Sequence, residues 1–168
     1  NRKIVQGLIN ELKISEEKQV KVIRAIDKLD KPGFGLKGVE DLLKKERKDQ
    51  SGAITKGADL TDQQAAQILN FLKIKDLKEL KQTLKNQLSQ EGISELENVF
   101  EILGYGSNLN QVKTNFTIVR GLAYYSDFIV ETNLNFKVTN NKGKEVDIGS
   151  ICSGGAYAKL ISRFRGVD

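Results

Sequence analysis

The chain has 168 residues, a length typical of about one domain, with 39% hydrophobic residues, 29% charged residues and a formal net charge of +5. Histidine is absent and cysteine occurs once, which excludes a catalytic triad with a histidine base, histidine-ligated metals, a disulfide framework and a multi-cysteine zinc site. The sequence has no apolar run long enough to cross a membrane and no signal-peptide stretch. The mild basic excess is compatible with an anionic partner, and the lack of methionine, even at position 1, indicates a piece of a longer protein.

Apolar residues recur at helical spacing through the first 104 residues. A first helix is predicted over about 1–14. A second begins after Ser15, a typical N-cap residue, and stops near Pro32. A third is predicted over roughly 36–48, and the polar stretch 49–60 reads as a loop.

Two capping patterns mark the helices that follow. Thr61 with Gln64 fits a capping box at the start of a fourth helix, and another helix covers about 76–89. Ser94 with Glu97 is read as the cap of a last helix, which ends at Gly104-Tyr105-Gly106.

Beyond residue 105 the hydrophobic period drops to two, which is typical of strands. Strands are predicted at 116–120, at 128–138 and, after a hairpin turn at 140–143, at 146–152. Gly154-Gly155 is expected to break the last strand before a short helix over 156–164. The predicted fold class is α+β, a helical module followed by an antiparallel sheet unit.

The segment from Val119 to Tyr125 has unusual chemistry for the end of a strand. Arg120 offers a bidentate guanidinium that suits a carboxylate or a phosphate. Gly121 lets a ligand approach the backbone, and Tyr124 and Tyr125 supply rings and hydroxyls. Such a cluster suits a small amphoteric ligand, and the alternative is a surface arginine beside two half-buried tyrosines.

A second segment, GSICSGGAY at residues 149–157, joins the last strand to the predicted helix. Backbone amides at the start of a helix hold anions, but a tight turn that requires Gly154 and Gly155 explains the same residues. Cys152 is expected to be a small buried thiol next to this glycine turn. It is not expected to be a nucleophile, because it has no partner histidine or acid to activate it.

Together these segments resemble the two signature motifs of histidyl-tRNA synthetase, a class II aminoacyl-tRNA synthetase. RGLAYY at 120–125 is similar to the family's R-G-L-acidic-Y-Y, and GGAYA at 154–158 is similar to its G-G-R-Y-D. The run AIDKLDK at 25–31 resembles a segment of the family's inserted helical domain, and residues 1–4 resemble the segment after its second class motif. The resemblance spans nearly the whole chain.

The resemblance implies a division into residues 1–14 as a helix of the catalytic domain, 15–104 as the helical insertion domain and 105–168 as the sheet part of the catalytic domain. It implies ATP-dependent formation of histidyl-adenylate and transfer to tRNA, with Mg²⁺ as the metal of ATP and no metal bound by this chain's own residues. A cytoplasmic homodimer that does not bind membranes is implied for the full-length protein. The chain alone is expected to be inactive, because the other class motifs are missing from it.

By the same resemblance, Arg120 is the catalytic arginine that contacts the histidine carboxylate and the α-phosphate of ATP. The residues implied to shape the histidine pocket are Tyr124, Tyr125, Gly154, Gly155 and Tyr157. Glu131 is expected to be structural.

Three positions depart from the family pattern. Ala123 stands where the family has an acidic residue, and Ala156 and Ala158 stand where it has Arg and Asp. These alanines favour an alternative, a non-catalytic synthetase-like paralogue that binds an amino acid or a partner. A third hypothesis is a helical RNA-binding module for which the sheet is only a platform.

Four basic residues at the end of the third predicted helix form a cluster: Lys44, Lys45, Arg47 and Lys48. By the resemblance, the inserted domain approaches the acceptor stem of tRNA(His), and these side chains are candidates for phosphate contacts. Lysines that interact with the negative end of a helix dipole explain the cluster almost as well.

Overall fold

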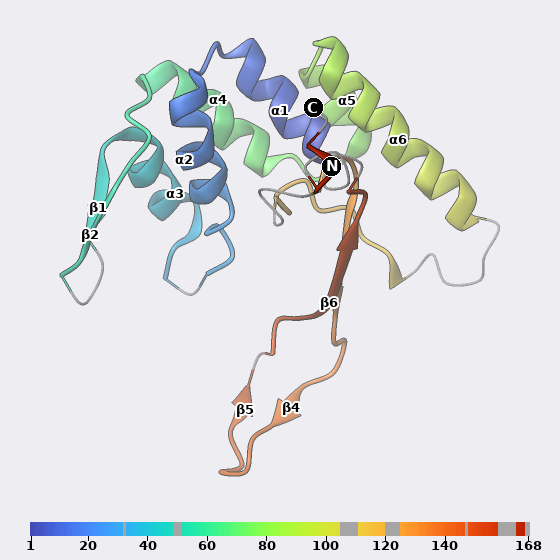
Figure 1. Cartoon of the computed structure of the whole chain (residues 1–168). Helices are drawn as coiled ribbons and strands as arrows, with labels where there is room; N and C mark the ends of the chain where they lie inside the picture. The colour runs from blue at the N-terminus through green and yellow to red at the C-terminus, as the bar shows by residue number, and fades with distance from the viewer. Residues whose placement is uncertain are drawn as a thin grey trace.

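The structure is a computed structural model that describes residues 1–31, 33–48, 52–104, 111–119, 125–146, 148–157 and 164–166. Its helices are α1 (Arg2–Glu11), α2 (Glu16–Ile26), α3 (Gly35–Lys44), α4 (Asp62–Lys73), α5 (Leu77–Thr83) and α6 (Gln87–Gly104). Its strands are β1 (Glu46–Lys48), β2 (Ile54–Lys56), β3 (Ile129–Asn133), β4 (Val138–Thr139), β5 (Glu145–Val146) and β6 (Ser150–Gly155). The helices lie together, and the arm built from β3 to β6 projects away from them (Figure 1). The α+β fold class is confirmed.

The core is formed mainly by the helices. Phe71, Ile68 and Leu80 are almost completely buried, and Phe116 and Val119 join the same apolar cluster from the segment before β3. None of the described helices is long and apolar enough to cross a membrane.

Helices α1 and α6 pack side by side at close range (Figure 1). A methyl group on Gly92 would lie 2.9 Å from Cγ1 of Ile4, so the helices need a glycine at this crossing. The buried hydroxyl of Ser89 donates a hydrogen bond of 3.0 Å to the carbonyl of Ile4. This contact holds the first turn of α1 against the first turn of α6.

Two of the helix starts predicted from capping residues agree with the structure, and a third does not. The capping box of Thr61 and Gln64 is present at α4, and α2 begins directly after Ser15, although the Ser15 side chain makes no capping hydrogen bond. The cap predicted at Ser94 is wrong, because Ser94 lies inside α6. That helix begins after Asn86, whose side-chain oxygen accepts a hydrogen bond of 2.8 Å from the backbone N–H of Ser89.

The third predicted helix is too long. Helix α3 ends at Lys44, and the next residues form β1, which pairs antiparallel with β2 inside the predicted loop. The chain returns from β2 across the end of α3, where the N–H of Ala58 donates to the carbonyl of Leu42 at 2.8 Å. The last carbonyls of α3 are therefore satisfied by this returning segment rather than by a further helical turn.

The first predicted strand is not formed in its described part, residues 116–119. Asn115 accepts hydrogen bonds from the N–H of Thr117 at 2.9 Å and from its hydroxyl at 2.6 Å. This local turn competes with strand pairing.

The predicted long strand 128–138 is divided into β3 and β4. The register between β3 and β6 shifts at Thr132/Asn133, and Gly149 adopts a φ of +70° just before β6. These irregularities separate the β3–β6 pair from the β4–β5 hairpin, whose turn at 140–143 is confirmed by the N–H of Gly143 donating to the carbonyl of Asn140.

The end of the last strand also differs from the prediction. Gly154 and Gly155 lie inside β6 and do not break it. Ala156 is not helical, because its N–H donates to the carbonyl of Phe128 at 3.3 Å and continues the pairing with β3. Residues 158–163 of the predicted helix lie outside the described residues.

Candidate functional site

The two motif segments meet where β3 and β6 pair. Ile129 lies opposite Gly155, and Val130 lies opposite Gly154 in an antiparallel ladder. The N–H of Ser126 donates a hydrogen bond of 2.8 Å to the carbonyl of Ala156, which extends the pairing beyond the ladder. Residues that precede β3 and residues that follow β6 therefore come together at one end of the strand pair.

A pair of aromatic rings lies at this end. The centroids of the Tyr125 and Tyr157 rings are 5.7 Å apart, and their planes differ by 20°. Tyr125 is half-buried, whereas Tyr157 is 51% exposed. A stacked, partly exposed tyrosine pair offers a flat apolar surface together with phenol hydroxyls, which suits a small aromatic or amphoteric ligand.

The two glycines of β6 are not equivalent. A methyl group on Gly155 would lie 2.8 Å from Cδ1 of Tyr125 and 2.8 Å from the carbonyl oxygen of Phe128. A methyl group on Gly154 would meet only a side-chain carbon of Val130, at an ordinary 3.6 Å. Gly155 is therefore required for the Tyr125 ring to lie against the backbone of β6, while Gly154 tolerates a small side chain.

Among the predicted site residues, the structure brings together Tyr125, Gly154, Gly155 and Tyr157. The predicted catalytic Arg120 and the predicted pocket residue Tyr124 lie outside the described residues, as do Ala123 and Ala158. The prediction of a buried Cys152 is wrong, because Ile151, Cys152 and Ser153 are all exposed in the middle of β6. In the described ranges, no group of three or more His, Cys, Asp or Glu residues is placed to hold a metal ion.

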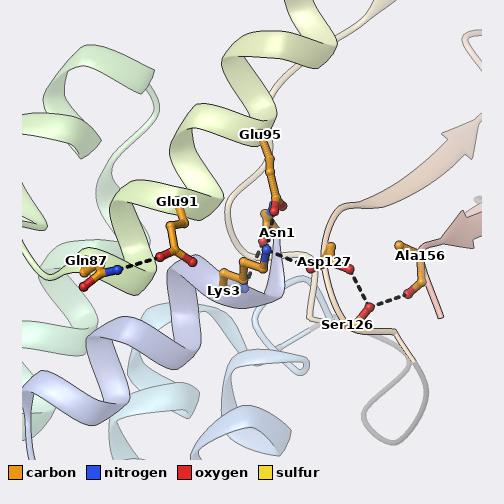
Figure 2. A network of polar contacts seen from close by, with 8 residues as sticks. All are labelled: Asn1, Lys3, Gln87, Glu91, Glu95, Ser126, Asp127 and Ala156. Carbon is orange, nitrogen blue, oxygen red and sulfur yellow. Dashed lines mark hydrogen bonds and ion pairs between the residues drawn. The ribbon is translucent and has the colours of Figure 1, made fainter. Parts of the chain in front are cut away.

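A polar network connects the strand pair to the helices (Figure 2). The ammonium of Lys3 forms ion pairs with Glu95 on α6 and, at 3.1 Å, with Asp127 just before β3. Hydrogen bonds from this ammonium to Glu95 and Asp127 raise the pKa of Lys3 above its usual value. Asn1 donates to the same Glu95 carboxylate at 2.7 Å.

Asp127 also faces the motif segments. Its second carboxylate oxygen accepts a hydrogen bond of 2.6 Å from the hydroxyl of Ser126, and its carbonyl accepts one of 2.8 Å from the N–H of Arg2. Sequence reasoning missed this network, because Lys3 and Glu95 are 92 residues apart and only the packing of α1 on α6 brings them together.

The basic cluster divides into two kinds of residue. Lys44 forms ion pairs with Glu40 at 3.0 Å and with Asp62 at 2.8 Å. The guanidinium of Arg47 lies 4.1 Å from the centroid of the Phe34 ring and donates a hydrogen bond of 2.8 Å to the carbonyl of Gly33. These two side chains make contacts within the protein.

The other lysines of this region are presented to solvent. Lys45 and Lys48 are exposed. In the β1–β2 ladder, Lys48 lies opposite Ile54 and Glu46 lies opposite Lys56, and all four side chains are exposed. Because Glu46 and Lys48 are two residues apart, these side chains share one face of the hairpin.

No family model matches the chain. Its sequence is 77% identical over all 168 residues to the histidine–tRNA ligase of Pelagibacter ubique, of which it covers 36%. It is 40% identical, over 99% of its length, to the histidine–tRNA ligase of Bartonella quintana, of which it covers 35%. The fold matches that of a crystal structure of histidyl-tRNA synthetase from Nostoc sp. PCC 7120 along the whole chain, with a TM-score of 0.71 and 29% sequence identity, and covers 36% of that chain.

The chain therefore spans about a third of the length of the curated relatives that it matches. The similarities confirm the resemblance to histidyl-tRNA synthetases along the chain, including its helical part.

Proposed function

We propose that this chain is the part of a histidine–tRNA ligase that recognises the amino acid. The observation that carries the proposal is the meeting of the two motif segments, where the stacked rings of Tyr125 and Tyr157 lie beside Gly155. The similarity to ligases along the whole chain supports histidine as the ligand. The tyrosine pair would contact the imidazole ring, and the backbone at Gly155 would let the amino acid approach closely. Gly154, which has room for a methyl group, would only extend the strand beside it.

Arg120 and Tyr124 complete the proposed site. They belong to the segment that leads directly to Tyr125 in the sequence. We assign to Arg120 the binding of the histidine carboxylate and of the α-phosphate, where its fixed charge stabilises the negative charge that develops as the adenylate forms. Tyr124 is assigned to the wall of the histidine pocket.

ATP would supply the adenylyl group that activates the amino acid, with pyrophosphate as the leaving group, and Mg²⁺ is its expected metal. The metal ligands are assigned to the other class motifs of the family. Because the other class motifs are missing from it, the isolated chain is expected to show no histidine-dependent exchange of pyrophosphate into ATP.

The proposed RNA partner is the acceptor stem of tRNA(His). Lys45 and Lys48 are the better placed of the four candidates, because their side chains are exposed. Arg47, which belongs to β1 and contacts Phe34, would act by holding the β1–β2 hairpin, and Lys44 would act by linking α3 to Asp62 at the start of α4. This assignment places phosphate contacts on a surface separate from the histidine site.

At the level of the whole enzyme, we propose a cytoplasmic homodimer without membrane contacts. Within the chain, we retain residues 15–104 as the insertion domain and residues 1–14 with 105–168 as catalytic-domain segments.

The proposal is tested with the full-length protein that carries this segment, by histidine-dependent pyrophosphate exchange. Arg120→Ala is expected to lower the exchange rate by about 10²–10³. Arg120→Lys is expected to retain little more activity, because lysine cannot form the two parallel hydrogen bonds of a guanidinium. Melting temperatures of both variants should stay close to that of the parent. Unchanged exchange in both variants contradicts the assignment.

The same assay distinguishes the ligase from a non-catalytic paralogue, the alternative that Ala123, Ala156 and Ala158 favour. A parent protein that binds histidine in calorimetry but shows no exchange has the paralogue's behaviour. In that case the triple change Ala123→Glu, Ala156→Arg and Ala158→Asp shows whether restoring the family's charged residues restores activity.

A further inference from the structure

We propose that Lys3, Glu95 and Asp127 form an ion bridge that positions the tyrosine pair of the histidine site, so that Lys3 is a positioning residue for amino acid recognition. The inference rests on the proposed function, because it assigns a role in the same site. The effect would be transmitted through Asp127 and Ser126 in the segment before β3 (Figure 2).

The bridge joins three elements that are distant in the sequence. Lys3 lies in the first turn of α1, Glu95 lies on α6, and Asp127 lies two residues before β3. One ammonium group contacts both carboxylates. Since the first turns of α1 pack closely on the first half of α6, the ammonium holds Asp127 against a packed pair of helices rather than against a single side chain.

From Asp127 the connection continues to the rings. The Asp127 carboxylate accepts a hydrogen bond from the Ser126 hydroxyl, and the Ser126 N–H donates to the carbonyl of Ala156. Ser126 directly follows Tyr125, and Ala156 directly precedes Tyr157. The hydrogen bond between Ser126 and Ala156 therefore sets the separation of the two stacked rings.

A second backbone contact fixes the same point. The N–H of Arg2 donates to the carbonyl of Asp127 at 2.8 Å. Asp127 is thus held by its main chain and by its side chain to the start of α1. Two attachments at one residue determine both the position and the direction of the strand that begins there.

The electrostatics favour a positioning role over a large contribution to stability. The side chains of Lys3, Glu95 and Asp127 are a quarter to a third exposed, and ion pairs with that exposure contribute little to the free energy of folding. Removing Lys3, however, takes away the ammonium that contacts both the Glu95 and the Asp127 carboxylates. Their repulsion would move the segment before β3 away from α6, and with it Tyr125.

The test measures KM for histidine and kcat in the pyrophosphate exchange of the full-length protein. Lys3→Gln is expected to raise KM for histidine roughly tenfold, since a small displacement of a positioned group is costly, while KM for ATP changes little. Lys3→Arg keeps the charge and should restore most of the loss. The double variant Lys3→Gln/Asp127→Asn should lie closer to the parent than Lys3→Gln alone, because the repulsion is removed.

Lys37 offers a matched control. It also lies between two carboxylates, those of Glu40 and Asp41, but on α3 and away from the tyrosine pair. Lys37→Gln should leave KM for histidine unchanged. An additional readout is amide hydrogen exchange at Ser126 and Ala156, which should become faster in Lys3→Gln and stay unchanged in Lys37→Gln.

The inference is overturned if Lys3→Gln leaves KM for histidine within twofold of the parent, or if it lowers the melting temperature and changes the KM values for histidine and ATP in parallel. A parent protein without histidine-dependent exchange refutes the proposed function instead, so the two failures are distinguishable in the unmodified protein.

Discussion

The helical part and the strand part of this chain bury their side chains to very different extents. In the helices, Phe71 and Leu80 are at most 1% exposed, whereas Val130 on β3 and Ile151 on β6 each expose 51%. The helical part therefore carries most of the apolar burial that stabilises the described structure. The strand pair contributes little burial, but its end holds the tyrosines and glycines of the candidate site.

The largest expected effect tests this division directly. Phe71→Ala removes a fully buried ring and should lower the free energy of unfolding by about 3–5 kcal/mol. Val130→Ala removes a half-exposed side chain, and its effect should stay below about 1 kcal/mol. Denaturant unfolding of both variants provides the measurement. Similar losses in the two variants would contradict the unequal contribution of helices and strands.

A smaller effect tests where the last helix begins. Asn86→Ala removes the side chain that accepts the N–H of Ser89 and should cost about 1 kcal/mol. Ser94→Ala, inside α6, should change stability by less than about 0.5 kcal/mol. Thermal unfolding followed by circular dichroism compares the stabilities of the two variants. A larger loss of stability in Ser94→Ala than in Asn86→Ala would indicate that the helix begins at Ser94, as the sequence pattern predicts.

The predicted helix starts at Thr61 and Ser94 show which helix starts the sequence can predict. The capping box at Thr61 could be predicted because all its contacts lie within one helical turn. The same local pattern failed at Ser94, since Ser94 is surrounded by a continuous helix whose start is set by Asn86 and by packing on α1. A local signal predicts a helix start only where the tertiary structure leaves the helix free to begin there.

The sheet shows a similar limit. Alternating residues correctly predicted strands near Ile129 and Val138, but they did not predict the irregular register at Thr132/Asn133. A register depends on the partner strand, so it is not encoded in one segment alone. The glycine pair Gly154-Gly155 likewise indicates a strand end when read alone, but pairing with β3 keeps both residues in β6.

At the candidate site, the motif residues could be predicted from the sequence, and their supporting contacts could not. Tyr125, Gly155 and Tyr157 belong to recognisable motifs, and the structure brings them together. The contacts of Lys3 with Glu95 and Asp127 exist only because the tertiary structure brings α1, α6 and the segment before β3 together. Hydrophobic periodicity and motif spacing do not predict a contact between segments so far apart in the sequence.

The central claim, that histidine is recognised where β3 and β6 meet, is tested most directly by comparing two neighbouring glycines in the full-length protein. Gly155→Ala introduces a methyl group that would displace the Tyr125 ring, whereas Gly154→Ala meets only an ordinary contact with Val130. We expect Gly155→Ala to raise KM for histidine at least about tenfold and Gly154→Ala to change it less than about twofold, with KM for ATP nearly constant in both. Equal KM values for histidine in the two variants would contradict the claim.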